Sequence, residues 1–118
     1  MIQRLHSGTR MSQVVIYPAS GHLVVLAGQV ADDRTADVTG QTQDVLAKID
    51  RLLADAGVDK TAIVSANVWL TDITTFDEMN AVWDAWVAPG HAPARACVES
   101  KLADPNLKIE IQVQALKA

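Results

Sequence analysis

The sequence predicts a two-layer α+β domain in which two helices pack on one face of a mixed β-sheet. Three runs, at residues 61–72, 94–101 and 107–117, alternate apolar and polar side chains as strands do. Two other stretches repeat apolar residues at three and four positions, as amphipathic helices do. The chain has 118 residues, 49% of them hydrophobic, so we expect one domain over residues 1–118 with a single core.

The first predicted elements are two short strands near the start of the chain. Residues 14–17 and 23–27 are short runs rich in β-branched side chains. The Pro-Ala-Ser-Gly segment at 18–21, which separates them, has the composition of a turn. We therefore predict that the two strands form a hairpin.

Both predicted helices carry signals at their ends. The first covers residues 42–56, and Gly57 follows it as a stop signal. The second begins at Thr75, where Glu78 three residues later completes a capping-box pattern, and it ends before Pro89. Asn80 departs from its apolar neighbours, which a solvated or locally capped side chain explains. The apolar face of this helix is expected to be core and comprises Phe76, Met79, Trp83 and Trp86.

Alternation along the last three strands divides the sheet into two faces. We expect the helices to cover an apolar face made of Ala62, Val64, Ala66, Val68, Leu70, Ala94, Ala96, Val98, Leu107, Ile109, Ile111, Val113 and Ala115. The open face would then carry Ile63, Asn67, Trp69, Arg95, Cys97, Glu99, Glu110, Gln112 and Gln114. Such a mixed surface suits a wet subunit interface, so we expect a closed homo-oligomer with sites between its copies.

Composition narrows the classes of function. The chain has 10 basic and 14 acidic residues, a net charge of -4, and its basic residues are scattered, so we expect no nucleic-acid partner. Cys97 is the only cysteine, which fits a reducing compartment. No apolar run approaches the roughly 20 residues that span a bilayer, and no secretory signal precedes the domain, so we expect a cytoplasmic protein without membrane contact.

The sequence offers no sign of a metal or cofactor site. It contains no GxGxxG, Walker A, CxxC, HExxH or GxSxG pattern. The three histidines, His6, His22 and His91, are far apart in the sequence. Any chemistry is therefore expected to use ordinary side chains, with no cofactor and no metal.

Arg95 and Glu110 are the residues of the predicted open face most suited to chemistry. They would share a face if their strands pair. An exposed cross-strand ion pair is one interpretation, and such pairs contribute only about 0 to 1 kcal/mol. In the other, the planar fork of Arg95 binds a substrate carboxylate while Glu110 positions or deprotonates a water. Spacing alone favours the ion pair.

Cys97 also has two interpretations. It lies two residues from Arg95 and would project the same way. A catalytic thiol needs a neighbour that lowers its pKa, and no histidine is close in the sequence. A small packed residue is therefore the favoured interpretation.

Two motifs together carry a family resemblance. The segment Pro93-Ala94-Arg95-Ala96-Cys97-Val98-Glu99 and the later Lys108-Ile109-Glu110-Ile111 resemble those of the Rid (YjgF/YER057c/UK114) family of reactive-intermediate deaminases. The helix containing residues 80–86 and the segments 26–30 and 57–70 also resemble this family, so the match covers most of the chain. Its amino-terminal differences place it closest to a divergent RidA-like subgroup.

The resemblance implies a chorismate-mutase-like fold assembled as a homotrimer, with sites in the clefts between subunits. It also implies hydrolysis of 2-imino acids, such as 2-iminopropanoate and 2-iminobutanoate, to 2-oxo acids and ammonia. Carried over to this chain, Arg95 would bind the substrate carboxylate, Cys97 would line the pocket, and Glu110 would hold the attacking water.

The chain departs from the family pattern in two places. Met11 begins the stretch in which many members carry a tyrosine that helps to close the pocket. Ala27 replaces the small hydroxyl residue before Gly28 and Gln29. The resemblance therefore implies a different pocket wall and a different side-chain preference.

Two functions of different classes remain open. The chain could be the imine deaminase, or it could be a non-catalytic trimer that binds small carboxylates or 2-oxo acids through the same Arg95 anchor. The ribonuclease activity ascribed to some family members has no support here, because the predicted face lacks a basic groove with stacking aromatic side chains.

Overall fold

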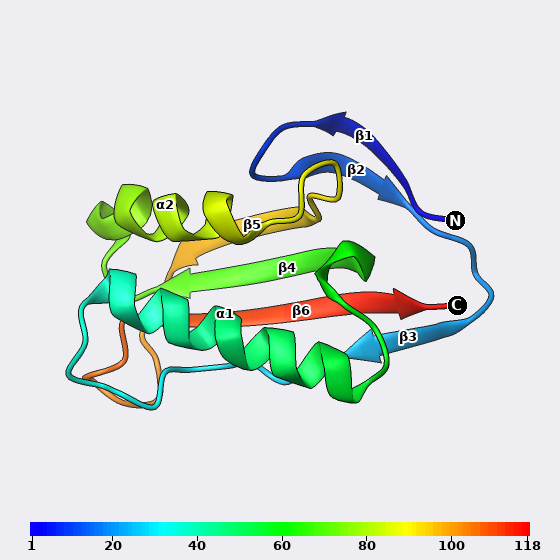
Figure 1. Cartoon of the computed structure of the whole chain (residues 1–118). Coiled ribbons are helices and arrows are strands. Elements are labelled where there is room, and N and C mark those ends of the chain that lie inside the picture. The colour runs from blue at the N-terminus through cyan, green and yellow to red at the C-terminus, as the bar shows by residue number, and fades with distance from the viewer.

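The computed structural model describes all residues, 1–118, and has the two predicted layers (Figure 1). Both helices lie on the same side of a four-stranded sheet (Figure 1). The strands follow the order β3-β6-β4-β5, in which β4 and β5 are parallel and the other pairs are antiparallel. The prediction of a mixed sheet with two helices on one face is thus confirmed. The elements are β3 (His22–Val25), α1 (Val38–Asp55), β4 (Ile63–Leu70), α2 (Phe76–Trp86), β5 (Ala94–Glu99) and β6 (Ile109–Lys117).

The core fills the space between the helices and the sheet. Strand β6 contributes every second residue, and Ile109, Ile111 and Val113 are at most 1% exposed. Helix α1 faces them with side chains at helical spacing, among which Ile49 and Leu53 are fully buried. This burial explains why apolar residues recur at every second position in β6 and at every third or fourth position in α1. No helix is both long enough and apolar enough to cross a membrane.

Helix ends differ in part from the prediction. Helix α1 starts four residues before the predicted position, because Asp37 caps it by accepting a hydrogen bond from the Gly40 backbone N–H at 2.8 Å. The predicted capping box of α2 is wrong. Thr75 makes no side-chain cap, and its hydroxyl instead donates to the Asp72 carbonyl at 2.7 Å. A short 3-10 helix, η2 (Ile73–Thr75), leads directly into α2 and removes the need for that cap.

The predicted hairpin between residues 14–17 and 23–27 is wrong. Strand β2 (Ser12–Ile16) pairs with β1 (Gln3–Ser7), and β3 pairs with β6 instead. Strand β1 escapes prediction because it is mostly polar and is interrupted by His6, whose φ is +52°. Two hydrogen bonds from Ser12, its N–H to the Pro93 carbonyl and its hydroxyl to the Ala92 carbonyl, join this hairpin to the start of β5.

An irregularity in β4 changes the predicted faces of its first residues. Ile63 pairs with Ala115 but Ser65 pairs with Gln114, so one residue is inserted between them as in a β-bulge. Ile63 consequently joins the core at 1% exposure, although alternation placed it on the open face. Beyond the bulge, Ala66, Val68 and Leu70 face the helices as predicted.

Candidate functional site

Arg95 and Cys97 face the helices and not the open side of the sheet. In the parallel pairing of β5 with β4, Arg95 lies opposite Ala66 and Cys97 lies opposite Val68, and both partners belong to the core face. The predicted orientation of β5 is therefore wrong. Alternation separates two faces of a strand but does not say which one the helices cover. Val98, predicted to be core, is 50% exposed on the open face.

Helix α2 holds the guanidinium of Arg95 in an aromatic and amide environment. Arg95 Nη1 donates a hydrogen bond of 2.8 Å to Asn80 Oδ1. Its guanidinium carbon lies 5.1 Å from the ring centre of Trp83 and 6.0 Å from that of Phe76, within the range of cation–π attraction. Burial lowers the pKa of Arg95, but an arginine remains protonated in a protein. The cluster thus carries a fixed positive charge.

This charge has no carboxylate partner in the chain. The ion pairs of the structure join Arg10 to Asp84, Arg34 to Asp104 and Lys48 to Asp32, and none includes Arg95. Two buried donors of the same cluster, Arg95 Nε and Asn80 Nδ2, have no hydrogen-bond partner within the chain. A half-buried cation with unfilled donors is costly in a folded chain unless it meets an anion.

A second arginine approaches the cluster from the turn between β1 and β2. Arg10 forms a two-pronged ion pair with Asp84 of α2, with both N–O distances at 2.9 Å. Its guanidinium carbon lies 5.6 Å from the ring centre of Phe76, and its carbonyl accepts a hydrogen bond from Trp83 Nε1. These contacts attach the turn to α2 beside Arg95. Sequence reasoning missed Arg10, because its partner lies 74 positions away.

Cys97 is a partly buried neighbour of Arg95. Its side chain packs against the hydrophobic core. Burial raises the pKa of the Cys97 thiol, and the charge of Arg95 opposes this effect only in part. The thiol is therefore mostly protonated near neutral pH, which agrees with a packed pocket residue better than with a nucleophile.

Glu110 lies on the open face, in one row with Trp69 of β4 and Val98 of β5. Its carboxylate rests against the backbone at Gly28, where an added Cβ would fall 2.0 Å from Oε2. Backbone hydrogen bonds of 2.8 and 3.1 Å between Gln29 and Ile111 fix the segment that contains Gly28. The absence of a side chain at Gly28 therefore determines where the Glu110 carboxylate lies.

One protomer does not bring Arg95 and Glu110 together. Strand β4 lies between β5 and β6, so the two strands do not pair as the prediction required. The two side chains also leave opposite faces of the sheet. The prediction of a shared face is wrong, and so is the cross-strand ion pair. The roles of Arg95, Cys97 and Glu110 in catalysis or binding stay predictions.

The single chain contains no enclosed pocket around these residues. Five hollows mark its surface, and none is lined by Arg95, Cys97 or Glu110. The two halves of the predicted site are thus open surfaces in a protomer. No group of three His, Cys, Asp or Glu side chains is arranged to hold a metal ion.

Comparison with known proteins places this geometry in a family. The family described as "Endoribonuclease L-PSP" matches residues 1–117. A solved structure of a member of the YjgF protein family from Neisseria meningitidis has a TM-score of 0.80 and 44% identity, covering 100% of this chain and 96% of its own. The chain belongs to the YjgF/Rid family. The predicted resemblance is confirmed at this level.

Named relatives within the YjgF/Rid family differ in what their names say. A "RutC family protein" from Haemophilus ducreyi is 44% identical over 115 residues, covering 98% of this chain and 96% of its own length. A "2-iminobutanoate/2-iminopropanoate deaminase" from Salmonella typhimurium is 31% identical over 104 residues, covering 82% and 81%. The more similar YjgF/Rid protein thus carries only a family name, while the more distant one is named for an activity.

Proposed function

We propose that this protein hydrolyses 2-imino acids, such as 2-iminopropanoate and 2-iminobutanoate, to 2-oxo acids and ammonia. The observation that carries the proposal is Arg95, a half-buried cation that has no carboxylate partner in the chain. A 2-imino acid supplies the missing anion next to its reactive carbon. The Salmonella relative named as a 2-iminobutanoate/2-iminopropanoate deaminase supports the choice of substrate.

Hydrolysis of a 2-imino acid needs only a bound carboxylate, an oriented water and a proton acceptor. Water adds to the C=N carbon, and the resulting tetrahedral adduct loses ammonia as its C–N bond breaks and the C=O bond forms. Arg95 would hold the carboxylate with its fork. Glu110 would hold the water, accept its proton as the C–O bond forms, and return that proton to the departing nitrogen. Orientation of the two reactants, with proton transfer worth about 10² to 10⁴-fold, accounts for such catalysis without a cofactor.

The site is proposed to form between protomers of a homotrimer. Arg95 and Glu110 leave opposite faces of one sheet, so one pocket that contains both requires Glu110 from a neighbouring copy. The open face also exposes apolar side chains, including Leu23, Val25 and Val98 at 50 to 55% exposure, that a neighbouring copy would cover. Cys97 would line the pocket beside Arg95.

A coupled assay tests the activity. An amino-acid oxidase generates the imine, and semicarbazide traps whatever the protein has not hydrolysed. The wild type should suppress formation of the semicarbazone, and Arg95→Ala should abolish this suppression. Equal trapping with wild type and variant would contradict the role of Arg95. Saturable binding of 2-oxobutanoate by a wild type without turnover would instead favour the non-catalytic carboxylate binder, for which the Arg95 cluster alone suffices.

Mixed oligomers test the division of the site. Arg95→Ala and Glu110→Gln are each inactive in the proposal, but refolding them together creates sites with Arg95 from one copy and Glu110 from the other. In random trimers about a quarter of the sites are intact, so about a quarter of the wild-type activity should return. Each variant refolded alone is the control. A mixture as inactive as its components would refute a site shared between copies.

A further inference from the structure

We infer that Asn80 is the positioning residue of Arg95, an uncharged partner that aims the guanidinium while leaving its charge free for a substrate carboxylate. The inference rests on the proposed function and gives a role to a residue that the sequence patterns mark only as a polar exception on its helix. Asn80 was expected to be solvated or locally capped, but it is only 1% exposed and its amide oxygen accepts from Arg95. A buried amide on an otherwise apolar helix face requires a polar partner, and Arg95 is that partner.

Hydrogen-bond chemistry fixes the orientation of the Asn80 amide. A guanidinium can only donate, so the atom at 2.8 Å from Arg95 Nη1 is the amide oxygen. The amide nitrogen therefore points away from Nη1 and keeps both its hydrogens free of any partner in the chain. Arg95 Nε is free in the same way. One cluster thus combines a positive charge with two buried donors that have no partner in the chain.

A comparison within α2 shows why the partner is an amide. Asn80 and Asp84 are four residues apart and so lie on the same side of the helix, and each faces one arginine. Asp84 binds Arg10 with both oxygens and neutralises it. Asn80 holds Arg95 with one oxygen and leaves the charge in place. The helix therefore holds two arginines in different ways. The Asp84 carboxylate neutralises the charge of Arg10, whereas the Asn80 amide leaves the charge of Arg95 without a counterion.

The inference predicts a conflict between stability and binding at this position. A half-buried cation without a counterion destabilises the folded chain, and a carboxylate at position 80 would remove that cost. The same carboxylate would occupy the fork that the substrate needs. A merely structural Asn80 would show no such opposition, because an aspartate that preserves shape and hydrogen bond would preserve function as well.

Asn80→Asp is the decisive variant, with Asn106→Asp as the matched control. Asn106 is exposed in the loop before β6, so its substitution adds the same charge away from Arg95. The probe is 2-oxobutanoate, and the measurements are its dissociation constant, the melting temperature and the turnover of 2-iminobutanoate. Asn80→Asp should raise the melting temperature and weaken probe binding at least about tenfold, because a hydrogen-bonded charge pair is lost from the complex. Asn106→Asp should change neither quantity.

The outcomes separate this inference from the proposed function. Binding of the probe without turnover by the wild type, together with the expected changes in Asn80→Asp, would support the inference and contradict the deaminase activity. Turnover and binding by Asn80→Asp at wild-type levels would overturn the inference and leave the activity standing. A fall in both melting temperature and binding would also overturn it, since Asn80 would then be only a packing residue. Absence of both probe binding and turnover in the wild type would overturn both.

Discussion

Arg95 and Glu110 project from opposite faces of one β-sheet and are separated by the whole width of strand β4. Arg95 lies under α2, against Asn80 and Trp83. Glu110 lies on the uncovered side, against the backbone of Gly28. One chain therefore presents Arg95 on one surface and Glu110 on another, and the proposed site needs an assembly of copies that unites them.

Arg95→Met should separate binding from stability. Methionine fills a similar volume and removes a half-buried charge that has no counterion, which offsets the cost of leaving the buried Asn80 amide without its partner, so the melting temperature should change little. Binding of 2-oxobutanoate should weaken at least about tenfold, since a charge-assisted hydrogen bond is worth about 1.5 to 3 kcal/mol. Calorimetric titration and thermal unfolding measure the two effects. A clear loss of stability would mean that Arg95 is chiefly a structural cation.

Gly28→Ala should displace Glu110 without disturbing Arg95. The new Cβ would fall 2.0 Å from Glu110 Oε2, so the carboxylate has to move. A displacement of about 1 Å in a reacting group typically lowers the rate about 100-fold, so kcat should fall. Binding of 2-oxobutanoate should stay close to that of the wild type. Gly8→Ala is the control, because a Cβ there meets only ordinary contacts. Unchanged kcat in Gly28→Ala would argue against Glu110 as water holder.

Val98→Asp should prevent assembly while the chain stays folded. Val98 is 50% exposed on the open face, and the proposed trimer would bury it beside Trp69. A charge there would be desolvated on assembly without a partner, at a cost of several kcal/mol. Light scattering should detect monomers, and circular dichroism should remain that of the wild type. Ile73→Asp, at a residue 40% exposed in η2 and outside the sheet, should leave assembly intact. If both variants form oligomers of the same size, the open face is not the interface between copies.

Thiol labelling should report the environment of Cys97. Burial raises the pKa of this thiol, so the folded protein should react with iodoacetamide along a pH profile shifted above that of an unfolded cysteine. Arg95 favours the thiolate, so Arg95→Met should shift the profile further upward. The same chain unfolded in urea is the reference, because Cys97 is its only cysteine. A profile at or below that reference would reopen the interpretation of Cys97 as an activated nucleophile.

The architecture could be predicted from the sequence wherever periodicity and burial agree. The helices and strands β4 and β6 have strong patterns because one side of each is fully buried, as Ile49 and Ile111 illustrate. Strand β5 misled the prediction because its apolar residues Ala94, Ala96 and Val98 face away from the helices. On the covered face, α2 offers an amide and aromatic rings that accept an arginine. The β1–β2 pairing depends on contacts between distant segments that no local pattern carries.

The candidate site was predictable only in part. The motif around Arg95 and Glu110 identified the family, which the comparisons confirm. The only sequence signal at Asn80 is a polar residue on a mostly apolar helix face. Such a residue is compatible with a buried hydrogen-bond partner, which the sequence alone does not identify. Arg10 could not be found in this way, since its place beside Phe76 follows from the fold of the β1–β2 turn.

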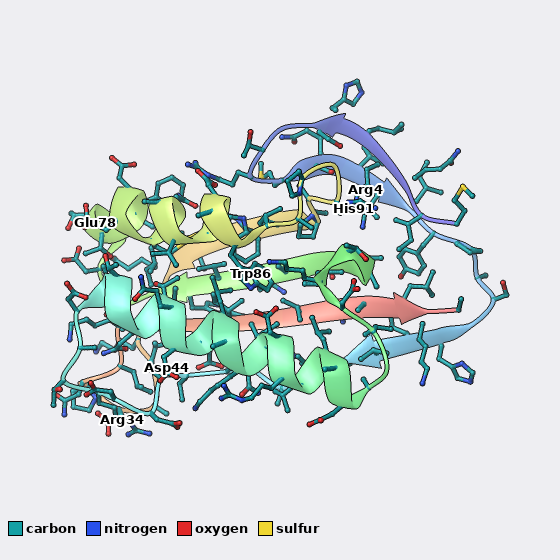
Figure 2. The ribbon with its side chains drawn as sticks, viewed as in Figure 1. Arg4, Arg34, Asp44, Glu78, Trp86 and His91 are labelled. Carbon is teal, nitrogen blue, oxygen red and sulfur yellow. The ribbon has the colours of Figure 1, made fainter.

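The tryptophans give the protein its own optical readout. Trp83 is completely buried with its ring 5.1 Å from the Arg95 guanidinium, while Trp69 lies beside Glu110 on the open face. Trp86 lies between the helices, 5.5 Å from Trp83 between ring centres, and its Nε1 donates to Asp50 (Figure 2). Indole emission depends on nearby charge and water. Ligand capture and subunit association would therefore change the fluorescence of different rings, and single Trp→Phe variants could time the two events separately in one unlabelled sample.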